Sequence, residues 1–225
     1  LLTMFASLPI LVMGTYDPRP VFPIIGRTRL TIIYPLMIPI AIAVTSNAVN
    51  MMDPFNGTMS GTCSILTLVL LVSSIFLGKE DATLLSAGLL GTLLAFYYFN
   101  RYPSRVFSGD VGSLSVGAAI GAIAVIGRME VVTLVAFMPQ IMNAFYGLST
   151  IGKLYERREV SRPIRILEDG RLAASSDPKA PITLARVILA RGPLTEREAT
   201  RVFMMLSAIA GVLAFLTMYL IMVTT

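Results

Sequence analysis

The chain has 225 residues, of which 55% are hydrophobic and only 14% are charged, and its formal net charge is +5. This charged fraction lies far below the quarter that is usual in soluble domains, so the composition excludes an ordinary soluble protein. No histidine is present, which excludes histidine-based acid–base catalysis, histidine-ligated zinc and histidine triads. The single cysteine, Cys63, excludes an internal disulfide.

Long apolar segments follow one another along most of the chain. Each has roughly 16–22 residues, close to the length of about 20 that a helix needs to cross a bilayer. The predicted spans are residues 30–49, 62–78, 82–99, 112–127, 131–151 and 202–222, and residues 1–14 have the character of the tail of another span. We therefore predict an all-α, polytopic integral membrane protein with about seven spans, forming one transmembrane domain over residues 1–225.

Prolines and glycines within these spans predict bends and close packing. Pro35 and Pro39 lie in one span and Pro139 in another, where each frees a backbone carbonyl and favours a kink. Glycines recur at helix-compatible spacing within residues 112–127, which is typical of helices that pack closely through small residues.

The basic residues are concentrated in alternate loops. If the loop at residues 50–61 is cytoplasmic and the spans alternate, the loops at residues 100–111 and 152–201 are cytoplasmic as well. Together these loops hold thirteen of the eighteen lysines and arginines, and the opposite side holds five. This distribution agrees with the positive-inside rule and places these loops on the cytoplasmic face.

The loop at residues 152–201 is the one sizeable extramembrane segment, and it precedes the last span. A turn-prone Glu168-Asp-Gly-Arg171 separates two short extended runs, so we expect a small β-hairpin across residues 163–174. Residues 180–191 predict a short surface helix that ends at Gly192-Pro193.

Amides and a carboxylate cluster at the end of one apolar run, in Asn47-Ala-Val-Asn-Met-Met-Asp-Pro-Phe-Asn-Gly57. Asn47 and Asn50 share a helix face, and Asp53 continues that face by one turn. Polar groups at a membrane boundary are costly and more often serve a site than fill space. Their oxygens suit Mg²⁺, with Mn²⁺ as an alternative, and a solvated helix cap explains the segment about equally well.

A second polar motif, Pro103-Ser-Arg-Val-Phe-Ser-Gly-Asp-Val-Gly-Ser113, lies at the start of another span. Asp110 suits a metal, and it also suits the cap of a helix N-terminus. Arg105 can neutralise phosphate together with the helix N-terminus, and Phe107 can stack on a base. A metal-binding carboxylate beside phosphate-binding groups is the combination that phosphoryl transfer requires.

Four arginines follow the next span, namely Arg157, Arg158, Arg162 and Arg165. Arginine is the preferred bidentate clamp for phosphate. The alternative is a cytoplasmic loop that obeys the positive-inside rule or touches anionic lipid. Glu156 and Glu159 interrupt the basic run, and we expect no nucleic-acid partner.

Four segments occur in a familiar order: Asn47-Ala-Val-Asn50, Asn56-Gly57, Pro103-Ser-Arg-Val-Phe-Ser-Gly-Asp110 and Phe137-Met-Pro-Gln-Ile-Met-Asn143. With these motifs the chain resembles the polyprenyl-phosphate N-acetylhexosamine-1-phosphate transferase superfamily, and most closely its UDP-GlcNAc–dolichyl-phosphate GlcNAc-1-phosphotransferase branch. The resemblance implies transfer of GlcNAc-1-phosphate from UDP-GlcNAc to a polyprenyl (dolichyl-type) phosphate, with release of UMP, as the first step of lipid-linked glycan assembly. It implies the cell membrane of a prokaryote or the endoplasmic reticulum of a eukaryote, with the site on the cytoplasmic face.

The resemblance also implies roles for individual residues. Asp110 and Asn50 match the family's metal-binding aspartate and its amide partner, and Asp53 is retained from a bacterial Asp-Gly-x-Asp-Gly run. These three residues form the expected catalytic set, with Mg²⁺ as cofactor. Substrate contacts are implied for Asn47, Asn56, Gly57, Arg105, Phe107, Arg157, Arg158, Arg162 and Arg165.

The sequence departs from the family pattern in three places. Pro54 and Asn56 interrupt the bacterial aspartate run, and no histidine completes the family's Arg-His-Arg element. No adjacent aspartate pair occurs, although the family carries one before the span that begins here. We therefore expect about three preceding spans, and we expect residues 1–225 alone to be inactive.

Two other functions fit the sequence pattern. A transporter or flippase for lipid-linked or nucleotide sugars also uses broken helices and polar residues within the membrane. A non-catalytic member of the family would explain the missing aspartate pair. The exposed apolar helix faces make a homodimer a further expectation.

Overall fold

The computed structural model describes residues 2–151 and 161–224, and of residues 149–151 it describes the backbone only. The first half contains η1 (Leu2–Ser7), α1 (Leu8–Met13), β1 (Val21–Phe22), β2 (Gly26–Arg27), α2 (Ile33–Met51), α3 (Thr58–Phe76) and α4 (Glu80–Asn100). The second half contains α5 (Gly109–Ile126), α6 (Glu130–Ala136), α7 (Met138–Ile151), β3 (Ile164–Ile166), β4 (Leu172–Ala174), α8 (Leu184–Leu189) and α9 (Glu196–Thr224). The predicted helical fold class is confirmed.

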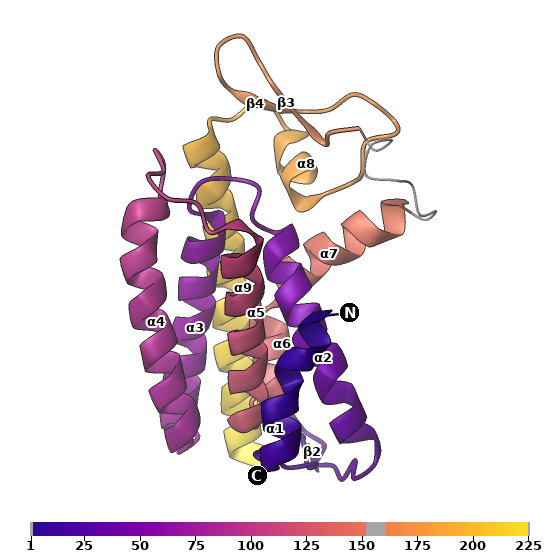
Figure 1. Cartoon of the computed structure of the whole chain (residues 1–225), viewed down its shortest axis with the longest axis vertical. Coiled ribbons are helices and arrows are strands. Elements are labelled where there is room, and N and C mark those ends of the chain that lie inside the picture. The colour runs from indigo at the N-terminus through magenta and orange to yellow at the C-terminus, as the bar shows by residue number, and fades with distance from the viewer. Residues whose placement is uncertain (1, 152–160, 225) are drawn as a thin grey trace.

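Five helices run roughly along the long axis of the molecule, namely α2, α3, α4, α5 and α9 (Figure 1). In the described part of the chain these five are long and apolar enough to cross a membrane, and α6 with α7 gives a sixth span if the bent pair is counted as one. The predicted tail of a further span forms η1 and α1, which together are shorter than a membrane span. The described residues thus contain five or six helical segments that could span a membrane, where the sequence predicts about seven spans.

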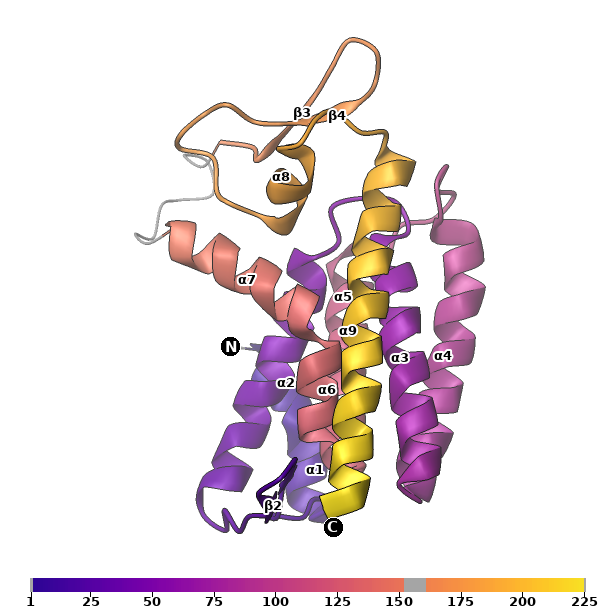
Figure 2. The ribbon, with the colours of Figure 1, turned by 180° about the vertical axis from the view of Figure 1, so that it is seen from behind.

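The span predicted at residues 131–151 is broken in the structure. α6 and α7 meet at an angle of 67°, and Figure 2 shows α7 leaving the bundle beneath α8. Pro139 accounts for the break, because it has no N–H to donate to the carbonyl of Val135 and its ring crowds that carbonyl. The predicted kink is confirmed, and the span predicted at residues 131–151 is a bent pair of helices.

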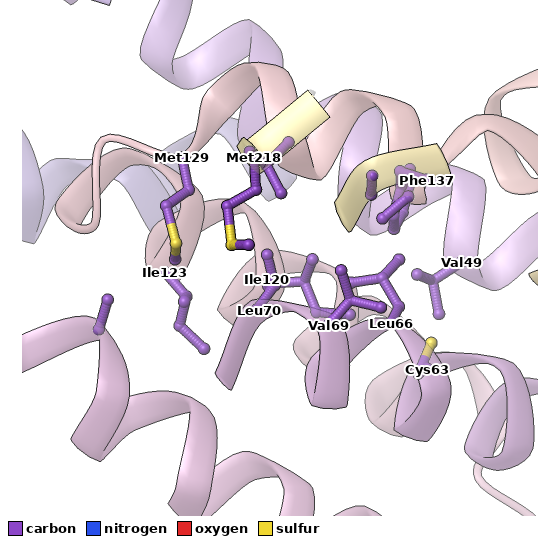
Figure 3. Close-up of a cluster of buried hydrophobic side chains, with 14 of the residues drawn as sticks. Val49, Cys63, Leu66, Val69, Leu70, Ile120, Ile123, Met129, Phe137 and Met218 are labelled. Atoms are coloured by element: carbon purple, nitrogen blue, oxygen red, sulfur yellow. The ribbon is translucent and has the colours of Figure 1, made fainter. Parts of the chain in front are cut away.

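α3 lies at the centre of the bundle and carries much of its core. Thirteen of its nineteen residues are buried. Figure 3 shows Leu66 and Val69 of α3 close to Ile120 of α5, with Met218 of α9 on the other side. Lipid tails are as apolar as these side chains, so within a bilayer such contacts stabilise the bundle through close packing rather than through removal from water.

α2 and α5 approach closely because α5 carries glycine at the contact. A Cβ added to Gly117 would lie 2.5 Å from the carbonyl oxygen of Thr45 and 2.6 Å from the Cα of Ser46. A Cβ added to Gly121 would lie 2.5 Å from the hydroxyl oxygen of Thr45. No side chain fits at these distances, so the two glycines set the helix spacing, as the sequence predicts.

The predicted extramembrane hairpin is present at one end of the bundle. β3 pairs with β4 in antiparallel register, and the hairpin lies with α8 near the N-terminal end of α9 (Figures 1 and 2). The helix predicted at residues 180–191 is shorter than expected. It begins only after Thr183, whose hydroxyl oxygen accepts a hydrogen bond from the backbone N–H of Arg186 and caps α8. A second small hairpin, β1–β2, lies at the opposite end and has no clear signal in the sequence.

Candidate active site

The structure brings the two polar motifs into direct contact. The side-chain amide of Asn50, at the end of α2, donates hydrogen bonds to Asp110 Oδ1 at 3.0 Å and to Ser113 Oγ at 2.9 Å. Asp110 and Ser113 lie near the start of α5, and the Asp110 side chain is exposed. The close approach of α2 and α5 at Gly117 places the end of one helix beside the start of the other. An amide and an accessible carboxylate from two motifs therefore share one site.

Asp53 holds the loop that leads into α5. Its Oδ2 accepts a hydrogen bond from Ser108 Oγ at 2.6 Å, and its Oδ1 accepts one from the backbone N–H of Met59 at 3.1 Å. Burial raises the pKa of the Asp53 carboxyl above its ordinary value of 3.8, and the two hydrogen bonds oppose this shift. Asp53 thereby joins the start of α3 to the residue before α5, close to Asp110 in the chain.

Asn47 lies one turn before Asn50 on α2. Its side-chain amide donates to the carbonyl of Ala43 at 2.7 Å and to Thr3 Oγ1 at 3.3 Å. The hydrogen bonds of the described residues join it to η1 and to its own helix. Its role in substrate binding stays a prediction.

Asn56 and Gly57 lie at the start of α3, next to α9 and α4. The backbone N–H of Asn56 donates to Glu196 Oε1 at 2.7 Å, and its carbonyl accepts from Thr200 Oγ1 at 3.2 Å. Gly57 has a φ of +78°, which glycine adopts without strain. A Cβ at Gly57 would lie 3.2 Å from the Cα of Arg101. These contacts give both residues a structural role, and their contact with uridine stays a prediction.

A buried asparagine that the sequence analysis did not single out holds the loop between α4 and α5. Asn100 Oδ1 accepts a hydrogen bond from Ser60 Oγ at 2.7 Å, and its Nδ2 donates to the carbonyl of Val106 at 2.9 Å. Phe107 follows directly and is 74% exposed, so its ring is accessible for stacking. The signal for Asn100 was an amide at the end of an apolar span.

A second missed asparagine connects three helices. Asn143 of α7 donates from Nδ2 to the carbonyl of Met51 at 2.9 Å, and its Oδ1 accepts from the backbone N–H of Leu184 at 2.9 Å. It belongs to the run Phe137–Asn143 that carries part of the family resemblance. Its buried amide ties the bent helix α7 to the end of α2 and to α8, beside the candidate site.

The structure divides the predicted substrate-binding arginines between two clefts. Arg162 and Arg165 line an open cleft of about 660 Å³ with Pro54 and Phe55, the two residues that follow Asp53. Arg105 lines a different cleft of about 510 Å³, which includes Asn56. The remaining two predicted arginines, Arg157 and Arg158, lie outside the described residues.

The donor set near Asp110 fits a hard cation that takes most of its ligands from elsewhere. Within the described residues, no three carboxylate, histidine or cysteine side chains come together as a metal cage. Mg²⁺ is commonly held by one or two carboxylates, with waters and substrate phosphates completing its shell. The exposed Asp110 carboxylate and the adjoining Asn50 amide match that mode of binding.

A polar site at one end of a bundle of apolar helices is consistent with an integral membrane protein. Residues 1–128 match the model of the family described as glycosyl transferase family 4. The chain belongs to this family. The membership agrees with the resemblance seen in the sequence motifs.

Three relatives, from archaea and bacteria, are named as transferases. A Saccharolobus solfataricus protein, provisionally named UDP-N-acetylglucosamine–dolichyl-phosphate N-acetylglucosaminephosphotransferase, is 27% identical over 220 residues, which cover 95% of this chain and 64% of the relative. A Methanocaldococcus jannaschii protein, provisionally named a glycosyltransferase, is 32% identical over 80% of this chain and 58% of the relative. The phospho-N-acetylmuramoyl-pentapeptide-transferase of Symbiobacterium thermophilum is 32% identical over 68% of this chain and 44% of the relative. The chain thus spans less than two thirds of the length of each.

Proposed function

We propose that this chain carries the site that transfers GlcNAc-1-phosphate from UDP-GlcNAc to a polyprenyl (dolichyl-type) phosphate. The observation that carries the proposal is the contact between Asn50 and Asp110, which unites the two polar motifs. The name of the Saccharolobus relative supports the same donor and acceptor. The products are UMP and a lipid that bears GlcNAc through a diphosphate.

In this reaction an oxygen of the lipid phosphate attacks the β-phosphorus of UDP-GlcNAc. The bond from the β-phosphorus to the oxygen that bridges the two phosphates breaks, and UMP leaves with that oxygen. Negative charge develops on the phosphoryl oxygens, so the protein contributes mainly by positioning and by charge stabilisation. A bound Mg²⁺ would neutralise part of this charge, and Asp110 with Asn50 would hold it.

Other residues of the chain are placed to bind the donor. The backbone N–H groups at the N-terminal end of α5 attract an anion through the helix dipole. Arg162 and Arg165 line the same cleft as Pro54 and Phe55, and their guanidinium groups are suited to the sugar diphosphate. The exposed ring of Phe107 is suited to stacking on the uracil base.

The bent helix α7 is suited to the lipid acceptor. Its exposed large apolar residues include Met138, Met142 and Phe145, which recur at intervals of four and three residues and therefore share one helix face. Because α7 turns out of the bundle by 67°, this face lies along a surface that an isoprenoid chain can follow. The Asn143 hydrogen bond to Met51 ties the same helix to the end of α2.

The orientation of the protein in the membrane is inferred from the distribution of its basic residues. Thirteen of the eighteen basic residues belong to the loops at residues 100–111 and 152–201. The positive-inside rule assigns these loops, and with them the proposed site, to the cytoplasmic face. UDP-GlcNAc would then reach the site from the cytoplasm.

Proteoliposomes distinguish transfer from transport. They should contain the full-length protein and receive UDP-GlcNAc labelled in the sugar, with or without polyprenyl phosphate. Transfer predicts label in the organic extract only when polyprenyl phosphate is present. Label that accumulates in the aqueous lumen without an acceptor would replace the proposal with a transporter.

A further inference from the structure

The cleft of about 510 Å³ between α4 and α9 has the chemistry of an anion site. Four of its eleven lining residues are arginines, namely Arg101, Arg105, Arg197 and Arg201, and none is acidic. The other residues include three tyrosines, Tyr97, Tyr98 and Tyr102. A concave surface with several guanidinium groups and no carboxylate favours phosphate, which arginine binds through paired hydrogen bonds.

None of these four arginines forms a salt bridge within the described part of the chain, where the ion pairs involve other residues, and Arg201 interacts electrostatically with Glu198 at longer range. The two carboxylates in the first turn of α9 are engaged with backbone N–H groups. Glu196 accepts from the N–H of Asn56 at 2.7 Å, and Glu198 accepts from the N–H of Thr195 at 2.9 Å. The positive charge of the cleft is therefore available to a ligand.

Two of the guanidinium groups are oriented by aromatic rings. Arg101 lies over the ring of Tyr98 at 5.3 Å from its centroid, and Arg197 lies over the ring of Tyr102 at 5.6 Å. A cation–π contact fixes the direction of a guanidinium group but leaves its charge unpaired. This arrangement lowers the conformational entropy that binding of an anion would cost.

The cleft lies at the end of α4 and the start of α9, two helices that are long and apolar enough to cross a membrane. Tyr97 belongs to the last turn of α4 before Asn100, and its hydroxyl lies 3.7 Å from the sulfur of Met204 of α9. Tyrosine is enriched at the level of the lipid headgroups. Basic pockets between membrane helices on the cytoplasmic side bind phosphate-bearing headgroups.

The cleft is on the opposite side of α3 from the proposed transfer site. α4 and α9 flank α3, whereas Asn50 and Asp110 meet between α2 and α5 (Figure 1). We propose that this arginine cleft binds a second phosphate group, distinct from the diphosphate of the donor. That phosphate belongs either to an anionic phospholipid headgroup or to a free phosphate. Arg105 and Asn56 then serve this second site rather than the nucleotide sugar.

The test is binding by the purified protein, compared between two double variants. Arg197→Gln with Arg201→Gln removes two charges from the cleft. Lys179→Gln with Arg191→Gln removes two charges from exposed positions of the same extramembrane loop and is the matched control. The probes are phosphatidylglycerol against phosphatidylcholine, measured by native mass spectrometry in detergent, and inorganic phosphate, measured by calorimetry.

We expect the cleft variant to bind one probe about 30-fold more weakly than the wild type, since it lacks two basic residues and each contributes about 1 kcal/mol near a membrane. We expect the control variant to bind like the wild type. Weakened retention of phosphatidylglycerol identifies a lipid headgroup, and weakened binding of inorganic phosphate identifies a free phosphate. If the cleft variant binds phosphatidylglycerol and inorganic phosphate as strongly as the control variant does, the proposal is overturned. A raised KM for UDP-GlcNAc in the cleft variant would also overturn it, because the cleft would then belong to the transfer site.

Discussion

Two carboxylates at the same end of the bundle have different surroundings. Asp110 is exposed and is contacted by the Asn50 amide at 3.0 Å. Asp53 is partly buried and accepts two hydrogen bonds from the protein itself. The Asp110 carboxylate is therefore available to a metal ion, whereas the Asp53 carboxylate is already bonded to the start of α3 and to the residue before α5.

Asp110→Asn should weaken metal dependence without unfolding the protein. The substitution removes one negative charge and leaves an oxygen at the same place, so we expect the Mg²⁺ concentration for half-maximal transfer to rise at least about 10- to 100-fold, the loss that altered metal surroundings already cause. The helix dipole interaction that is lost is worth only about 0.3–1 kcal/mol. Transfer rates across a Mg²⁺ titration measure the effect.

Asp81→Asn is the matched control for this change. Asp81 also lies in the first turn of a helix, α4, where it is exposed. Its removal should cost a similar amount of helix stability and leave the Mg²⁺ titration unchanged. An Asp110→Asn enzyme with the titration of the Asp81→Asn enzyme would remove Asp110 from the site.

Asp53→Asn should remove a pH dependence of stability. The pKa of Asp53 is raised above 3.8 in the folded protein by burial, so the folded state binds the proton more tightly than the unfolded state. The contribution of Asp53 to stability is therefore fully present below pH 3.8 and is lost as the pH rises through the folded pKa. We expect the melting temperature of the wild type minus that of Asp53→Asn to fall as the pH rises above about 3.8. A difference that grows with pH would contradict the assignment.

At the scale of elements, the packing of α2 against α5 determines whether the two motifs meet. Gly117→Ala would place a methyl group 2.5 Å from the carbonyl oxygen of Thr45, so the helices must separate. We expect a loss of about 1–3 kcal/mol in stability, which is the usual cost of overpacking. We also expect a loss of transfer activity, because Asn50 moves away from Asp110. Thermal unfolding and transfer rates measure the two effects.

Gly88→Ala is the control for the glycine substitution. Gly88 lies in α4, and an added Cβ there meets no atom within 4 Å. Alanine is the better helix former by roughly 0.5–1 kcal/mol, so this variant should be as stable as the wild type or more so, with full activity. Equal behaviour of the two variants would show that the α2–α5 spacing does not control the site.

The β3–β4 hairpin gives a second prediction at this scale. Arg162→Ala and Arg165→Ala should raise the KM for UDP-GlcNAc more than the KM for the lipid phosphate, because both residues line the cleft beside Pro54. Arg191→Ala, an exposed residue of the same loop outside that cleft, should change neither. Steady-state kinetics with each substrate varied in turn provide the measurement. If the KM for UDP-GlcNAc is unchanged, these arginines do not bind the donor, and their charge serves only the orientation of the protein in the membrane.

At the scale of the whole molecule, the sequence predicts the membrane helices well because hydropathy depends on composition alone. It also predicts the kink at Pro139, since the missing N–H is a local property. The angle of 67° between α6 and α7 cannot be predicted from the local sequence. It accompanies contacts of Asn143 with Met51 and Leu184, which are distant in the chain.

The sequence predicts the central pair of the candidate site, but not how the surrounding residues are arranged. Asn50 and Asp110 were identifiable as polar residues at the ends of apolar spans, and the structure places them in contact. The division of Arg105 and Arg165 between two clefts was not predictable, because it depends on which side of α3 each loop follows. The role of Asn100 was hidden for a similar reason, since its partner Ser60 lies on another helix.

The central claim is that a phosphoryl group, rather than a sugar alone, moves to the lipid. UDP-GlcNAc labelled with ³²P in the β-phosphate and with ³H in the sugar tests it directly. Both labels should enter the lipid in equal molar amounts, with one UMP released for each lipid product. Transfer of ³H alone, with ³²P retained in released UDP, would contradict the account, because it would show that the bond between sugar and phosphate breaks instead.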